Sequence, residues 1–180
     1  MCPDWTGEKA SGSHSDFGNA VEAFRQATVS FLNGDPEPAM ELYSRRDDVT
    51  LANPLGPPRR GPVDVAKAAA EAAAQVSDGS IRRIEEVSRY STHELGYVVQ
   101  IEHVQARFAG SGNMSPFALR ATMIFRREGD TWKIAHRHAD AIVTPRPAST
   151  VIEAEESIGS GYGSPEPVST SLAARWVGLL

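Results

Sequence analysis

Ionisable side chains alternate near the end of the segment FALRATMIFRREGDTWKIAHRHADAIV, residues 117–143, at His136, His138 and Asp140. Alternate residues of a strand project to the same side, so these groups could meet. A metal site built on the two histidines would need a third ligand from elsewhere, and the chain's single cysteine, Cys2, lies far away in sequence, so we expect no metal. We expect Asp140 to orient the His138 imidazole for acid–base chemistry near a pocket mouth. The competing role is a buried polar pair at a subunit interface.

A second candidate for acid–base chemistry, His103, lies in the run LGYVVQIEHVQARF, residues 95–108. It shares one face of the predicted strand with Tyr97, Val99 and Ile101. If this face points into the protein, His103 could act as a general base or as a hydrogen-bond donor. The alternative is a histidine packed in an apolar core with its polar atoms satisfied.

Two strands joined by a tight turn are predicted to position the ionisable groups of residues 117–143. Apolar residues alternate through Leu119, Ala121, Met123 and Phe125, and a second alternation includes Trp132 and Ile134. Glu128, Gly129 and Asp130 between the two runs supply a polar turn that contains glycine. The second strand of this hairpin therefore begins apolar and ends with ionisable residues.

The remaining elements follow from hydrophobic periodicity and from proline and glycine breaks. Helices are predicted over residues 17–32, with Asp16 as N-cap, and over 36–45 and 62–75, and strands over 47–53, 80–91 and 95–108. A break is expected at Ser77-Asp78-Gly79. Because the helices are confined to the N-terminal half and the long strands follow one another, the sequence predicts an α+β fold, with three helices on the concave face of a bent antiparallel sheet.

Composition limits the possible function. The chain has 180 residues and 41% hydrophobic content, which suits one packed core. One cysteine cannot form an intrachain disulfide, and the sequence shows neither a signal peptide nor a membrane-spanning run, so we expect a cytoplasmic protein without a membrane partner. The formal net charge of −5 comes from the terminal segments, whereas residues 17–146 are electrically neutral. A neutral body argues against nucleic acid as a partner.

The expected domain organisation has three parts. Residues 1–16 form a flexible arm, residues 17–146 form the folded domain, and residues 147–180 form a disordered acidic linker that ends in a short amphipathic segment, residues 171–180. That segment carries Trp176 and could dock on its own domain, on a second copy of the chain or on another protein.

The order of these elements is similar to that of a known family. The residues that carry the likeness are Asn53-Pro54, Gly96-Tyr97-Val98-Val99 and LRATMIFRREGDTWKIAHRHAD, residues 119–140. With them, about residues 17–145 resemble the SnoaL-like and ketosteroid isomerase-like branch of the nuclear transport factor two-like superfamily. The resemblance implies a cone-shaped α+β barrel, commonly dimeric. Such interiors serve isomerases, polyketide cyclases and dehydratases, as well as non-catalytic ligand binding and subunit association.

The resemblance also implies site residues. It suggests that Arg120 and Thr122 line the pocket, with Ile124 beside them under the helices, so that the apolar face of the hairpin is left for a second subunit. This is the reason to expect a homodimer. Arg120 would bind a carboxylate or enolate oxygen of a substrate, and its alternative role is an ion pair with Glu102 or another acid.

Asn53 and Tyr97, together with Thr122 and Ile124, are the expected ligand contacts. Ketosteroid isomerase uses an aspartate base with a tyrosine and a protonated aspartic acid. Near Asn53 the first-strand acid of that set is replaced, so steroid isomerisation by that mechanism is not expected.

Two functions of different classes remain from the sequence. The first is a cofactor-independent isomerase, cyclase or dehydratase in which His103 or His138 transfers a proton and Arg120 stabilises charge. The second is a non-catalytic ligand-binding or association module whose C-terminal segment recruits a protein partner.

Overall fold

The computed structural model describes residues 13–151. The chain divides into two units, residues 1–143 and 144–180, and the described part of the second contains only the short 3-10 helix η1 (Ala148–Val151). The elements of the first unit are, in chain order, α1 (Ser13–Phe31), α2 (Glu37–Met40), β1 (Thr50–Ala52), β2 (Arg59–Arg60), α3 (Pro62–Ala73), β3 (Val76–Ser91), β4 (Leu95–Phe108), β5 (Met114–Glu128) and β6 (Thr131–Asp140).

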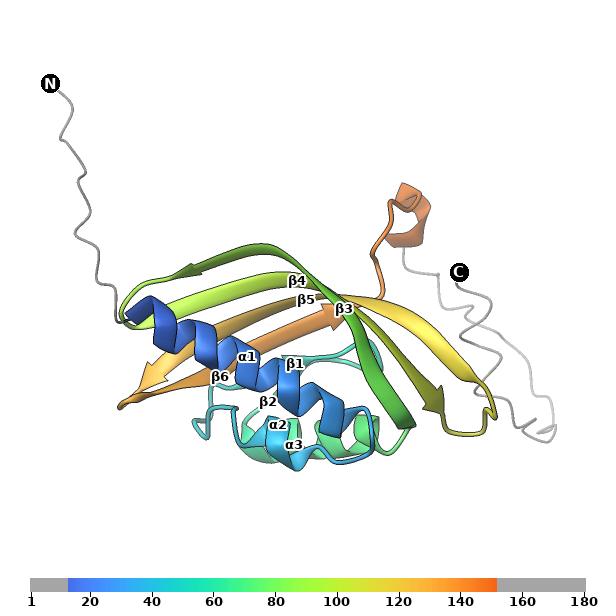
Figure 1. Ribbon diagram of the computed structural model, residues 1–180, viewed down its shortest axis with the longest axis horizontal. Helices are drawn as coiled ribbons and strands as arrows, with labels where there is room; N and C mark the ends of the chain where they lie inside the picture. The colour runs from blue at the N-terminus through green and yellow to red at the C-terminus, as the bar shows by residue number, and fades with distance from the viewer. Residues whose placement is uncertain (1–12, 152–180) are drawn as a thin grey trace, which may run out of the picture. The chain divides into compact units, whose positions relative to one another are not determined.

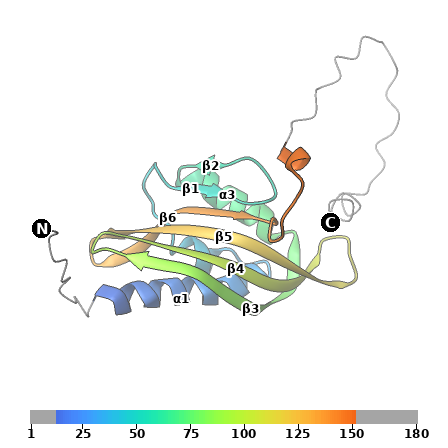
Figure 2. The ribbon, with the colours of Figure 1, turned by 90° about the horizontal axis from the view of Figure 1, so that it is seen from above.

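The strands form one six-stranded sheet in the order β2-β1-β6-β5-β4-β3. The long strands β3 to β6 form a consecutive antiparallel meander that curves beside α1 (Figures 1 and 2). The short strand β1 pairs in parallel with β6, so the sheet is mixed, and it does not close into a barrel. The predicted α+β class, with three helices in the N-terminal half, is confirmed.

Helix α1 covers the concave face of the sheet because its apolar residues recur at helical spacing. Phe17, Val21 and Phe24 are all buried on this side. The ring centroid of Phe17 lies 5.3 Å from that of Phe125 and 5.1 Å from that of Trp132, which fixes the helix against β5 and β6. The helix begins at Ser13, so the last residues of the expected N-terminal arm belong to α1.

The two faces of the central strands differ in burial. The concave face, which points toward α1, is formed by the buried side chains of Val98, Gln100, Glu102, Ala121, Met123 and Phe125. The opposite face, here called the convex face, carries Tyr97, Val99, Ile101, Arg120, Thr122 and Ile124, which are half-buried or exposed.

The expectation that Arg120, Thr122 and Ile124 lie under the helices is therefore wrong. A strand turns only one face toward a covering helix. In β5 that face carries Met123 and Phe125, because their burial removes more apolar surface from water.

Strand β3 and helix α2 also differ from their predicted bounds. Strand β3 begins at Val76 and runs through the expected break, which the structure accommodates with a register shift between Ser77 and Ser80 and a positive φ of 52° at Asp78. Helix α2 has four residues, shorter than predicted.

Candidate ligand-binding site

An irregularity in β6 decides which of its polar residues reach the interior. Phe125 pairs with Ile134 but Ile124 pairs with His136, so Ala135 is an extra residue on β6. Strict alternation would have placed His136 and His138 on the same face as Ile134. The extra residue reverses this, so that Arg137 points to the concave face and the two histidines point to the convex face.

Arg137 and Glu102 form an ion pair in the interior. Arg137 Nη2 donates to Glu102 Oε2 at 2.7 Å, and the two residues are 9% and 3% exposed. Such a pair can be buried only because each charge is compensated by the other. Arg137 Nε is buried and has no hydrogen-bond acceptor within residues 13–151, so the guanidinium retains an unused donor.

Glu102 is held in place from its other side. Gln100 Nε2 donates to Glu102 Oε1 at 2.9 Å, and Gln100 Oε1 in turn accepts from Arg25 Nη2 at 2.8 Å. Arg25 Nη2 also donates to Glu86 at the protein surface, at 2.8 Å. A continuous chain of hydrogen bonds therefore runs from β3 across α1 and β4 to the interior pair, and it fixes the direction in which Glu102 points.

Tyr43 and Phe24 complete the surroundings of the ion pair. Burial raises the pKa of Tyr43 to about 12, with a lowering influence from Arg137 and a smaller raising one from Glu102. The phenol is therefore protonated at neutral pH. The guanidinium carbon of Arg137 lies 5.7 Å from the centroid of the Phe24 ring, a distance that allows a cation–π interaction.

The concave face is incompletely covered beside Glu102. Leu119 is the direct cross-strand partner of Glu102, and Ile84 pairs with Glu102 on the other side, yet both are only half-buried. Phe117, one step further along β5, is also half-buried. Protonated and cationic donors, a carboxylate and partly accessible apolar side chains therefore occur together on this face.

The catalytic residues predicted from the sequence lie on the convex face. Arg120 Nη2 donates to Asp140 Oδ2 at 2.7 Å, and His138 Nε2 lies 3.7 Å from the same oxygen. Burial alone would raise the pKa of Asp140, but the hydrogen bonds from Arg120 and the Ile142 amide, with the nearby charges, lower it. The predicted proximity of His138 and Asp140 is thus present, and the acid beside Arg120 is Asp140 and not Glu102.

His103 lies apart from that cluster. Its Nε2 is 2.9 Å from Arg83 Nη2 and 3.8 Å from Glu85 Oε2, toward the β3 side of the convex face. The structure therefore brings together Arg120, His138 and Asp140, whereas the polar contacts of His103 are with Arg83 and Glu85.

The predicted ligand contacts do not share one surface with the ion pair. Tyr97, Thr122 and Ile124 lie on the convex face. Asn53 follows β1, where its Oδ1 accepts from the Leu55 amide at 2.9 Å.

Sequence reasoning missed the residues that meet on the concave face. They are Arg25, Tyr43, Gln100, Glu102 and Arg137. One sequence pattern could have indicated two of them. Gln100 and Glu102 lie at two-residue spacing between Val98 and Val104, so all four residues share one face of β4. No comparable pattern reveals Arg137, because its orientation depends on the extra residue in β6.

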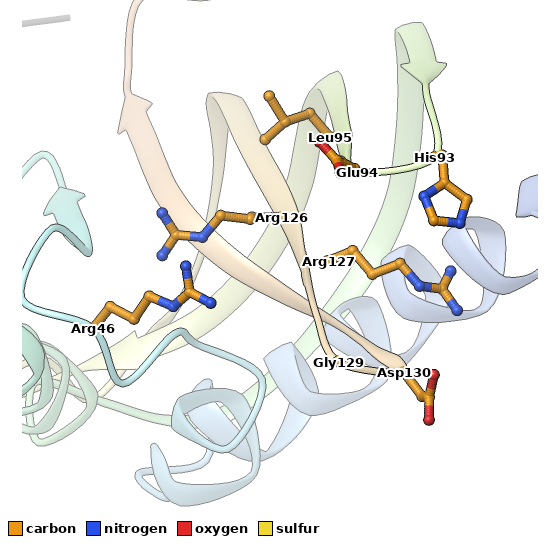
Figure 3. Close-up of a pocket in the computed structure, with 8 residues that line it drawn as sticks. All are labelled: Arg46, His93, Glu94, Leu95, Arg126, Arg127, Gly129 and Asp130. Atoms are coloured by element: carbon orange, nitrogen blue, oxygen red, sulfur yellow. The ribbon is translucent and has the colours of Figure 1, made fainter.

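A separate surface pocket of about 530 Å³ lies at the end of the β5–β6 hairpin (Figure 3). Its lining includes Arg46, Arg126 and Arg127, and none of the predicted site residues. Arg126 is engaged by Asp48, Glu128 and Ser44, and Arg127 lies over the Trp132 ring. The contacts of Arg126 tie the β5–β6 hairpin to the segment before β1, so both arginines already have partners within the protein.

Residues 13–151 contain neither a group of metal-ligand side chains nor a membrane-spanning helix. No three histidine, cysteine or acidic side chains there are grouped as metal ligands would be. The described helices include none with the length and apolar character needed to cross a bilayer.

The fold matches several solved structures that are less than 25% identical in sequence. A putative dehydratase from the NTF2-like family of Streptomyces avermitilis shares 23% identity over 76% of this chain and 100% of that chain, with a TM-score of 0.63. A ketosteroid isomerase-like protein from Erwinia carotovora atroseptica shares 17% identity over 74% and 98%, with a TM-score of 0.62. A putative calcium/calmodulin-dependent protein kinase type II association domain from Thiobacillus denitrificans shares 22% identity over 69% and 93%, with a TM-score of 0.58.

These similarities establish the fold and leave the activity open. None of the curated proteins matches the chain. The sequence model of a protein family, the SnoaL-like domain, matches residues 20–144, which is more than half of the sequence. The chain therefore belongs to the SnoaL-like family.

Proposed function

We propose that this SnoaL-like domain binds a small organic molecule on the concave face, against Arg137, Glu102 and Tyr43. The observation that carries the proposal is the buried Arg137 guanidinium, whose Nε has no acceptor among the described residues. A buried donor without an acceptor is costly, and a ligand oxygen would remove that cost. Half-buried Leu119 beside Glu102 provides partly accessible apolar surface for the body of the ligand.

The same groups could support proton transfer without a cofactor. Glu102 would accept a proton from a carbon or oxygen of the substrate, and Arg137 would stabilise the oxyanion that forms. Tyr43, whose pKa is raised by burial to about 12, would serve as a hydrogen-bond donor and not as a base. This chemistry suits an isomerase, cyclase or dehydratase. In this proposal the proton-transferring residue is Glu102, in place of the convex-face histidines His103 and His138 that the sequence suggested.

Binding can be tested by blocking the concave face without changing any charge. A library of small organic molecules is screened by thermal shift against the wild type, Leu119→Trp and Thr122→Trp. We expect compounds that stabilise the wild type to lose their effect on Leu119→Trp, because the indole occupies the surface beside Glu102. Thr122→Trp is the matched control on the convex face. Compounds that lose their effect only on Thr122→Trp would contradict the proposal.

Catalysis has its own test once a compound that is turned over has been found. Glu102→Gln should abolish turnover and leave measurable binding, because the amide cannot accept the proton. Unchanged turnover would show that Glu102 is not the base.

A second candidate function, self-association, is favoured by the convex face. Its register places Tyr90, Tyr97, Ile124 and His136 in one row across four strands. Three of these are large and uncovered, with Tyr97 38% and Ile124 39% exposed. We propose that a second copy of the chain covers this face, with the Arg120–Asp140 pair and His138 at the interface.

The molar mass of the protein in solution tests whether two copies associate through the convex face. We expect the wild type to be a dimer by light scattering at micromolar concentration, and Ile124→Asp to be a monomer, because it buries an uncompensated charge. Val63→Asp is the control, since Val63 is 78% exposed on α3. A monomeric wild type would refute the proposal.

A further inference from the structure

We infer that the ligand of the concave face is a monocarboxylate with an apolar body, whose carboxylate accepts hydrogen bonds from Arg137. The inference rests on the proposed function and adds the chemical class of the ligand. It follows from the donors that Arg137 has left, from the constraint on Glu102 and from the apolar groups around the guanidinium.

The hydrogen bonds of Arg137 use only part of its capacity. A guanidinium has five N–H donors. Within residues 13–151 the polar contact of Arg137 is the single bond from Nη2 to Glu102 Oε2, and Nε is buried without an acceptor. Planar carboxylates match the spacing of two neighbouring guanidinium N–H groups, so the unused edge of Arg137 is suited to this group.

Glu102 is prevented from taking up the unused edge. Its Oε1 accepts from Gln100 Nε2, and Gln100 is anchored in turn by two hydrogen bonds from Arg25, of 3.2 and 2.8 Å. If Glu102 rotated to bind Arg137 through both oxygens, it would break this chain. The arrangement thus holds the resident carboxylate to one side, so that Glu102 does not satisfy the buried Nε of Arg137.

The charge and surroundings select among anions. Glu102 already places one negative charge beside Arg137, so a singly charged carboxylate is tolerated better than a doubly charged phosphate. Phe24 lies against the guanidinium, and Leu119 and Phe117 are partly accessible on the same face. An acid with an aromatic or branched aliphatic body would contact these side chains while its carboxylate meets Arg137.

Benzoate and benzamide provide a matched pair of probes, because they share size and shape and differ in charge. Binding is measured by calorimetry or by chemical-shift titration of the full chain. We expect benzoate to bind about tenfold or more tightly than benzamide, as an additional charge-assisted hydrogen bond would give. Equal affinity for both probes would overturn the carboxylate assignment and leave the proposed function intact. Absence of benzoate binding would also overturn it.

Two substitutions with effects of opposite sign locate the carboxylate. Arg137→Gln should abolish the preference for benzoate, and Glu102→Gln should increase benzoate affinity, because the competing negative charge is removed while the shape is kept. Arg107→Gln is the matched control, since Arg107 pairs with Asp78 at 3.0 Å elsewhere on the sheet. If Arg137→Gln does not fold, Glu102→Gln decides alone. Unchanged or weaker benzoate binding to folded Glu102→Gln contradicts the inference.

Discussion

Arg137 and Glu102 form their 2.7 Å ion pair across an intervening strand. Arg137 belongs to β6 and Glu102 to β4, and β5 lies between them in the sheet. The residue of β5 that pairs with both Gln100 and Ala139 on the concave face is Ala121, whose small side chain leaves space for the arginine to reach over it. The structure therefore joins two non-adjacent strands through an ion pair in the interior.

The first prediction concerns the ion pair itself. Arg137→Met and Glu102→Leu should each lower the free energy of unfolding by about 3–5 kcal/mol, because each leaves an uncompensated buried charge. The double variant Arg137→Met/Glu102→Leu should lose much less free energy of unfolding than the sum of the two single losses, since no isolated charge remains. Urea unfolding of the wild type, the two single variants and the double variant measures the coupling energy between the two side chains. Strictly additive losses would show that the two side chains do not interact in solution.

The second prediction concerns the contact between Gly79 of β3 and the end of α1. A Cβ at position 79 would lie 2.6 Å from the backbone oxygen of Leu32, a distance that requires the backbone to move. Gly79→Ala should therefore lower the free energy of unfolding by about 1–3 kcal/mol, as overpacking does. The control is Gly112→Ala, because an added Cβ there has nothing within 4 Å. Equal stabilities of the two variants would argue against the close approach.

The third prediction concerns pH and His136. Burial, and then the nearby His138, lower the pKa of His136 from 6.5, so the folded state binds a proton less readily than the unfolded state. The stability that this neutral histidine contributes is therefore complete above pH 6.5 and declines as the pH falls below that value.

His136→Gln tests this dependence, because the amide can still hydrogen-bond to Thr50 Oγ1, which lies 2.8 Å from His136 Nδ1. We expect the free energy of unfolding of the variant to fall less than that of the wild type between neutral and mildly acidic pH. His93→Gln, which replaces an exposed histidine between β3 and β4, should follow the wild type. Parallel curves for wild type and His136→Gln would count against the prediction.

The fourth prediction concerns Arg126, which ties the β5–β6 hairpin to the segment that precedes β1. Its Nη1 and Nη2 donate to the two oxygens of Asp48 at 2.6 and 2.9 Å, and Nη2 and Nε donate to Glu128. The side chain of Ser44, which is buried, joins the same cluster through Glu128 at 2.7 Å. Lysine has the charge but not the planar fork, so it cannot make these bonds together.

Arg126→Lys should lower Tm by several degrees more than Arg120→Lys, since the main partner of Arg120 is one oxygen of Asp140. Scanning calorimetry of the two variants gives the comparison. The two substitutions should have equal effects only if the Asp48 and Glu128 bonds are not formed.

The sequence predicted the elements of the fold well, because they depend on local patterns. The alternation from Leu119 to Phe125 and the Glu128-Gly129-Asp130 turn define the hairpin, and the spacing of Phe17, Val21 and Phe24 defines α1. The order of these elements also led to the family that the SnoaL-like model confirms. Proximity of His138 and Asp140 followed from strand periodicity alone.

The tertiary structure decided which side of the sheet became the interior. Both faces of β5 are compatible with a strand, and the choice depends on the apolar stripe of α1, about a hundred residues earlier in the chain, which packs against Phe125 and leaves Arg120 on the convex face. The extra residue Ala135 then turns Arg137 inward and His138 outward. Local sequence determined where strands and helices form, because hydrogen bonding and periodicity act over a few residues. Contacts between distant segments determined the site, because burial of one face is settled only when the helix and the sheet meet.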